Sequence, residues 1–173
     1  FKIFGCENYV TDNDDDFFEN LLVGEKKPEE VVFEARPGMY LMKTLNTDRL
    51  SINLTLKRSE EKKLRGLIED FTNYFDYIFI DFPPSSSRLT EILLDISEKI
   101  LLVVALDPLG INGYTNTIQY FVDCDIEIEK ISHIIPIKYH PIKITPNKAL
   151  KELKNYAKQY TPEAIITTPI KEK

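Results

Sequence analysis

Two acidic residues follow long apolar runs, where a carboxylate could do chemistry. Asp81 comes directly after Tyr-Ile-Phe-Ile, and Asp107 comes after Ile-Leu-Leu-Val-Val-Ala-Leu. In open parallel sheets, ligands bind outside the carboxyl ends of the strands. A carboxylate at such an end can hold a hydrated Mg²⁺, directly or through water, as a Walker B acid does. An acid that only caps a turn would give the same pattern, so both interpretations stay open at this point.

The residues that follow Asp81 favour the chemical interpretation. Residues 81–85 read Asp-Phe-Pro-Pro-Ser and lead into a serine-rich helix start. Consecutive prolines fix the backbone of a loop and remove two N–H donors. A loop stiffened in this way can move as a unit beside a phosphate group. The alternative is an ordinary strand-to-helix turn.

The elements that must position these residues alternate along the chain. Helices are expected from Asp14–Asp16 to Gly24, Pro28 to Ala35, Ser59 through Phe71, Ser86 or Ser87 through Ile96, Asn112 through Phe121, and Thr145 through Tyr160. Strands are expected at Tyr40–Leu45, Tyr77–Ile80, Ile100–Leu106, Ile131–Ile137 and Ala164–Thr168. Wholly apolar strands, each followed by a helix, are typical of a parallel sheet covered on both faces. The expected class is therefore α/β.

Composition narrows the function classes. The 173 residues, 43% of them hydrophobic, are enough for one domain over residues 1–173. A net charge of −6 excludes a basic nucleic-acid coat protein. No apolar run approaches the ~20 residues of a membrane span. The two cysteines exclude a disulfide scaffold and indicate a cytoplasmic protein. Charge is uneven, with a balance of −7 over residues 1–34 and +5 from Lys138 to the end.

A specific resemblance lies in residues 75–113, printed below with the preceding Tyr74. The segment YFDYIFIDFPPSSSRLTEILLDISEKILLVVALDPLGING is similar to the central part of the ParA/Soj family of P-loop ATPases. The shared features are an Asp-Tyr pair before the apolar run, the acid, Pro-Pro-Ser, a Leu-Thr pair, a second apolar strand and a helix that contains glycine. Residues 17–32, 40–50 and 164–173 resemble the family more loosely. The resemblance thus extends over nearly the whole chain and implies a P-loop NTPase-like fold.

The family's phosphate-binding loop has no counterpart here. No G-x-x-x-x-G-K-[ST] pattern occurs, and the family places this loop before the residue matched by Phe1. We therefore expect the chain to be an internal portion of a larger protein, incomplete at both ends. A natural remnant without a nucleotide site is the alternative.

The resemblance implies a site for ATP and Mg²⁺. Asp81 would organise the metal ion through water. The other implied nucleotide contacts come from the proline loop and from the loops after the last two strands, namely Pro83, Pro84, Ser85, Lys138, Tyr139 and Pro169. Ile170 stands where the family's Ile-Pro-Arg element has arginine.

The implied function is DNA partition. Family members form homodimers around ATP, bind DNA non-specifically, and are switched by hydrolysis that a ParB-type centromere-binding protein stimulates. The expected location is the cytoplasm, at the nucleoid and not at a membrane. Two alternatives stay open, a MinD-like membrane-associated regulator and a non-catalytic α/β binding module.

A line of lysines on the last helix fits the DNA-binding interpretation. Lys148, Lys151 and Lys158 lie away from the expected apolar stripe, with Lys154 beside them. At 3.6 residues per turn, spacings of three and seven make a nearly continuous basic line. Such a line can contact DNA phosphates without reading sequence. A solvated helix face would show the same pattern.

Overall fold

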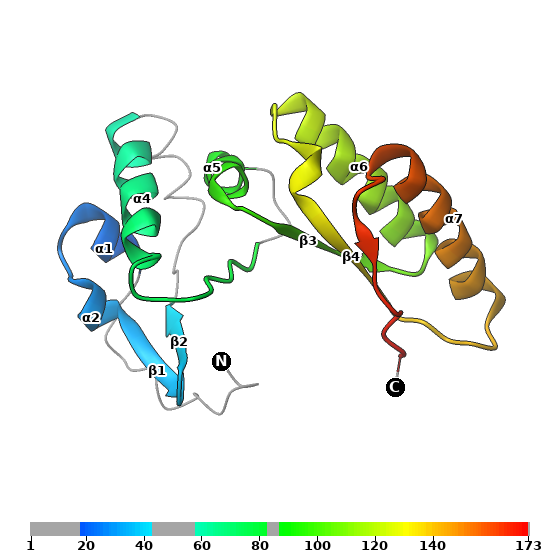
Figure 1. Cartoon of the computed structure of the whole chain (residues 1–173), viewed down its shortest axis with the longest axis horizontal. Coiled ribbons are helices and arrows are strands. Elements are labelled where there is room, and N and C mark those ends of the chain that lie inside the picture. Colours follow the sequence, from blue (N-terminus) through cyan, green and yellow to red (C-terminus); the bar gives the residue numbers. More distant parts are fainter. Residues whose placement is uncertain (1–17, 43–57, 83–86, 173) are drawn as a thin grey trace. The chain divides into compact units, whose positions relative to one another are not determined.

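The structure, a computed structural model, describes residues 18–42, 58–82 and 87–172 (Figure 1). The chain divides into two compact units, residues 1–92 and residues 93–173. The second unit contains a three-stranded parallel sheet with helices between its strands, so the α/β class is confirmed. The single domain over residues 1–173 stays a prediction. None of the described helices is long and apolar enough to cross a lipid bilayer.

The first unit combines short helices with a hairpin. Its elements are α1 (Phe18–Val23), α2 (Pro28–Val31), β1 (Val32–Arg36), β2 (Met39–Met42), α4 (Arg58–Phe71) and the start of α5 (Arg88–Ile96). Gly24 ends α1 with a φ of 82°, and Gly38 makes the hairpin turn with a φ of 76°. Both values lie in the left-handed region, which glycine enters at low cost. Pro37 and Gly38 form the turn that joins β1 to β2.

The predicted helix from Pro28 to Ala35 is wrong in its second half. Helix α2 ends at Val31, and the following residues form β1, which pairs antiparallel with β2 through Val32↔Met42 and Phe33↔Leu41. Val and Phe favour strands, and the Pro-Gly turn brings an apolar partner strand beside them. This cross-strand pairing outweighs the local helical pattern.

Helix α4 supplies much of the core of the first unit. Phe71 packs with Leu21 and Val31 in a buried cluster. Residues partly buried against that cluster are Val32, Met42, Leu67, Ile68 and Phe75. Leu64, about two turns before Phe71 on α4, is fully buried. The predicted helix from Ser59 through Phe71 is confirmed, and it begins one residue earlier, at Arg58.

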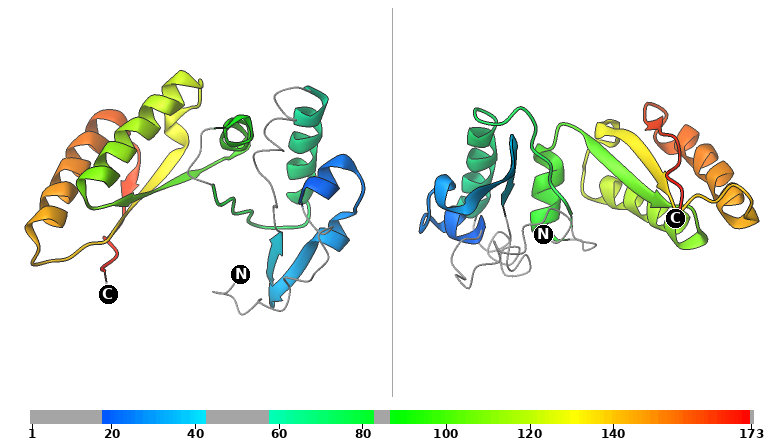
Figure 2. Two further views of the ribbon diagram at one scale, coloured as in Figure 1. Left: turned by 180° about the vertical axis from the view of Figure 1, so that it is seen from behind. Right: turned by 90° about the horizontal axis from the view of Figure 1, so that it is seen from below.

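The second unit is built on the parallel order β3-β4-β5. Its elements are β3 (Ile100–Ala105), α6 (Pro108–Asp123), a 3₁₀ turn (Ile128–Lys130), β4 (Ile131–Ile137), α7 (Ile144–Tyr160) and β5 (Ile165–Ile166). These strands match the predictions closely, although β5 is shorter than expected. Figure 2 shows α6 and α7 side by side on one face of the sheet. Phe121, Leu153 and Ile134 are fully buried, and the hydroxyls of Tyr114 and Thr161 are hydrogen-bonded at 2.8 Å.

The start of α6 differs from the prediction. Asp107, not Asn112, is the N-cap, because its Oδ1 accepts a hydrogen bond from the Gly110 N–H at 2.8 Å. Pro108 occupies the first helical position, where its missing N–H costs nothing. An Asp-Pro pair is a stronger helix start than an asparagine further along. Asn112 is an exposed residue inside the helix.

Candidate functional site

The prediction of a strand at Tyr77–Ile80 is wrong for the described part of the chain. The segment has no strand pairing within the described residues, and Tyr77 and Phe79 are 82% and 84% exposed. A strand forms only where a neighbour accepts its backbone hydrogen bonds. The apolar run of the sequence is present, but no strand of the described part of the chain lies against it.

Asp81 follows this segment with an exposed side chain. Among the described residues, no hydrogen bond or ion pair engages its carboxylate, and no group of three His, Cys, Asp or Glu side chains gathers into a metal site. An accessible carboxylate fits Mg²⁺, which takes few protein ligands and completes its shell with water and phosphate oxygens. Pro83, Pro84 and Ser85 lie outside the described residues.

An ion-pair network holds the helix that follows the proline loop. The Arg88 guanidinium donates to Glu61 of α4 at 2.8 Å and to Glu91 at 2.9 Å, and Arg65 donates to Glu61 at 3.0 Å. The hydrogen bond from Arg88 is the largest effect on Glu61 and lowers its pKa; burial, the next largest effect, opposes this lowering, and Arg65 adds to it. The Ser87 Oγ accepts the Thr90 N–H at 3.2 Å, which confirms the predicted serine at the helix start. The network therefore ties the start of α5 to α4.

Replacing Arg88 by Ala should weaken this tie in a pH-dependent way. Because the folded-state pKa of Glu61 is lowered, its stabilisation is present above the unfolded value and is lost as the pH falls through the folded one. We expect the variant to lose about 1 kcal/mol of unfolding free energy at neutral pH, a modest figure because these side chains are partly exposed. Urea unfolding at neutral and strongly acidic pH measures the difference.

Lys63→Ala is the matched control, since it removes only an exposed pair with Glu60 on the same helix. It should change the unfolding free energy by no more than a few tenths of a kcal/mol at either pH. An Arg88→Ala deficit of the same size at acidic and at neutral pH would show that Glu61 is not its electrostatic partner.

In the second unit, the carboxyl ends of β4 and β5 bring together three of the predicted site residues. The N–H of Tyr139 donates to the carbonyl of Ile170 at 3.0 Å, and Tyr139 forms a parallel bridge with Lys171. The N–H of Ile170 donates to the carbonyl of Pro136 at 2.9 Å. Lys138 and Tyr139 therefore lie beside the segment that contains Pro169, at the edge where parallel sheets bind ligands.

Asp107, which the sequence places at the end of a strand, joins this cluster through Lys138, a neighbour that the sequence did not indicate. One oxygen of its carboxylate caps α6, and the other lies 4.0 Å from the Lys138 amine. Lys138 has a φ of 58°, which lies in the left-handed region. The chain therefore changes direction at Lys138, directly after the end of β4. The pair is largely exposed, and the amine stays accessible to an anionic ligand.

The predicted DNA-binding lysines all lie on α7 with exposed side chains. They are separated from the buried stripe of Ala149, Leu153 and Ala157 on the same helix. Within the described part of the chain, no ion pair engages Lys148, Lys151 or Lys158. These positive charges are therefore available to an anionic partner.

The second unit is a parallel α/β unit with accessible polar groups at the carboxyl ends of its strands, which is where α/β proteins of this class bind their ligands. Comparison with known proteins makes the assignment specific. Residues 5–131 match the family described as "AAA domain", and the chain belongs to this P-loop ATPase-like family, which is related to ParA and MinD.

Two relatives from Pseudomonas putida resemble the chain more distantly. One is described as an uncharacterized protein and the other as an uncharacterized protein in the gidB 3′ region. Each is 22% identical over 142 residues, which are 79% of this chain and 54% of the relative. The chain thus spans about half the length of the curated relatives it matches. The family points to ATPase activity in general terms, with ATP and Mg²⁺ as the ligands that such domains use.

Proposed function

We propose that the chain is part of a ParA-type partition ATPase, in which Mg²⁺-ATP drives dimerisation and hydrolysis switches off DNA binding. The observation that carries the proposal is the exposed carboxylate of Asp81, which no described residue engages. It follows an apolar run and precedes Pro-Pro-Ser in a chain of this family. The Pro-Pro-Ser sequence resembles ParA proteins, whereas MinD-like proteins have a Pro-Ala-Gly type of sequence there.

In this proposal each part of the candidate site has one task. Asp81 would hold Mg²⁺ through water, and the ion would supply positive charge for in-line attack of water on the γ-phosphate. Pro83, Pro84 and Ser85 respond to the presence of that phosphate. Lys138, Tyr139 and Pro169 offer a cation, an aromatic ring and an apolar surface to the nucleotide base. A second copy of the chain completes the dimer, and a ParB-type protein stimulates turnover.

The exposed lysines of α7 supply the proposed link to DNA and to the nucleoid. Their side chains carry positive charge that no described residue neutralises, although the chain as a whole is acidic. Each phosphate contact adds affinity that is independent of sequence and falls with salt. Non-specific binding of this kind is what a partition ATPase requires.

The test replaces Lys148, Lys151 and Lys158 by Glu in the full-length protein. Retention on duplex DNA in the presence of ATP should be abolished at moderate salt, because three phosphate contacts become repulsive. In variants with Ala at these positions, the dependence of log affinity on log salt should lose a slope of about 3. Filter binding or fluorescence anisotropy over a salt series measures both quantities.

The matched control is the same charge change at exposed lysines elsewhere, with Lys62, Lys63 and Lys99 replaced by Glu. This variant should keep most of its ATP-dependent retention. Unchanged retention in the α7 variant would discard the DNA-binding role of this helix. Retention on anionic lipid vesicles in place of DNA would favour the MinD-like alternative.

A further inference from the structure

The last strand of the parallel sheet has one edge that no described strand covers. Within the described residues β5 pairs only with β4, and Ile165 is 60% exposed. The Thr167 N–H donates to the Ile134 carbonyl at 3.0 Å, toward β4. Because successive residues of a strand direct their N–H and C=O groups to opposite sides, those of Ile166 point to the free edge. The run Ala-Ile-Ile-Thr-Thr at 164–168 contains neither the charges nor the prolines that usually protect such an edge.

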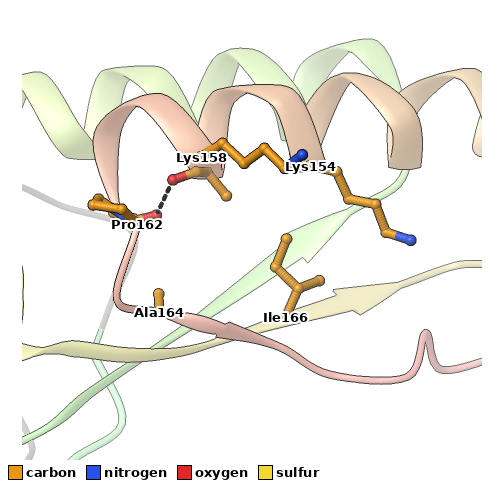
Figure 3. Close-up of a pocket in the computed structure, with 7 residues that line it drawn as sticks. Lys154, Lys158, Pro162, Ala164 and Ile166 are labelled. Carbon is orange, nitrogen blue, oxygen red and sulfur yellow. Dashed lines mark hydrogen bonds between the residues drawn. The ribbon is translucent and has the colours of Figure 1, made fainter.

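A groove lies between this edge and helix α7. It has a volume of about 310 Å³, and its lining is largely apolar: Lys154, Ala157, Lys158, Thr161, Pro162, Ala164 and Ile166. Figure 3 shows Ile166 pointing from the strand toward the helix, with Lys154 and Lys158 extending from the helix beside it. We call this surface the α7–β5 groove. One long wall is a helix with two cations, and the other is a strand whose backbone groups at Ile166 face away from β4.

Lys154 and Lys158 give the groove a positive charge. Neither amine forms an ion pair with another residue in the part of the chain that the structure describes. Like charges at positions i and i+4 of a helix repel each other, so an anionic occupant would relieve this repulsion. The spacing also suits a strand, because four helical residues rise about 6 Å. Two residues of a strand advance about 6.6 Å.

We propose that the α7–β5 groove binds an extended, acidic segment of a partner protein, which adds to β5 as a further strand. The backbone of the segment pairs with the free edge at Ile166, and its alternate side chains turn toward α7. Acidic residues two positions apart in the segment pair with Lys154 and Lys158. The methylene groups of these acidic side chains cover the apolar floor of the groove. Duplex DNA would use the two charges but leave the apolar floor and the strand edge unused.

The test uses the full chain and a fluorescein-labelled hexapeptide of alternating Glu and Val. Anisotropy should show saturable binding. A peptide of the same composition with its three Val residues before its three Glu residues should bind at least about tenfold more weakly, which corresponds to about 1.4 kcal/mol. Equal binding of the two peptides, or no binding of either, would overturn the proposal.

Charge reversal locates the site. Lys154→Glu with Lys158→Glu should weaken the alternating peptide at least about tenfold. Lys148→Glu with Lys151→Glu, on the same helix but outside the groove lining, should leave it within about twofold. Equal losses in the two double variants would contradict the proposal, because they would indicate general attraction to α7. Duplex DNA can also be tested as a competitor of the peptide. If DNA binds at the groove and the Lys154→Glu, Lys158→Glu variant no longer binds it there, the groove is a nucleic-acid site and the proposal is wrong.

Hydrogen exchange reports whether a strand is added. The amide of Ile166 should exchange more slowly when the alternating peptide is bound, since its N–H would gain a carbonyl partner. The amide of Thr167, already bonded to Ile134, serves as the internal control. Peptide binding without slower exchange at Ile166 would rule out strand addition.

Discussion

Replacing Asp81 by Asn in the full-length protein is expected to reduce Mg²⁺-dependent ATP hydrolysis by roughly 100- to 1000-fold. A carboxylate that holds the metal ion by charge and through water cannot be replaced by a neutral amide of the same shape. The lost stabilisation of the transition state would be about 3–4 kcal/mol, the size attributed to a single well-placed electrostatic group. Phosphate release at saturating ATP and Mg²⁺ measures the turnover number.

The structure predicts that this loss comes without a loss of stability. Asp81 is exposed, and within the described residues no partner engages its carboxylate, so its replacement removes no structural contact. Asp81→Asn should therefore unfold at the same urea concentration as the wild type, within the ±0.5 kcal/mol typical of surface changes. Asp70→Asn, an exposed acid near the end of α4, is the control and should keep full turnover. Normal hydrolysis in the Asp81 variant would remove the basis of the proposed function.

The second unit could be predicted from the sequence because its signals are local. The run Ile100–Leu106 is apolar throughout and became β3, and Thr145-Pro146 lies at the start of α7. Hydrophobic periodicity specified which side of each helix would be buried, as Leu153 and Ala157 show. These features depend on a few neighbouring residues, which the sequence displays directly.

The errors occur where distant residues decide the outcome. Val32 became a strand residue because Met42 lies opposite it, and Tyr77–Ile80 lacks a strand because no described residue pairs with it. In the site, the nearness of Tyr139 to the Pro169 segment follows from the rule that parallel strands end at one edge. The pairs Arg88–Glu61 and Lys138–Asp107 join residues far apart in the chain, and no sequence pattern marks them.

One close backbone contact of the second unit also escapes sequence reasoning. Gly110 lies in the first turn of α6, only five residues after the end of β3. A Cβ added at Gly110 would overlap the backbone carbonyl oxygen of Ala105, and it would also crowd the carbonyl carbon and Cα of that residue. Backbone atoms of a strand cannot rotate aside as a side chain can. The glycine is therefore required by packing and not by its own φ angle.

Gly110→Ala should consequently be among the most destabilising single substitutions in this unit, with a loss of about 3 kcal/mol in unfolding free energy from overpacking. Gly113→Ala is the matched control on the same helix, because nothing lies within 4 Å of its added Cβ. That variant should gain roughly 0.5–1 kcal/mol from the better helix propensity of alanine. Urea titrations of both variants measure opposite shifts of the midpoint. If Gly110→Ala were as stable as Gly113→Ala, α6 would not approach the end of β3 this closely. The position of the Asp107 cap beside Lys138, which depends on that approach, would then also be wrong.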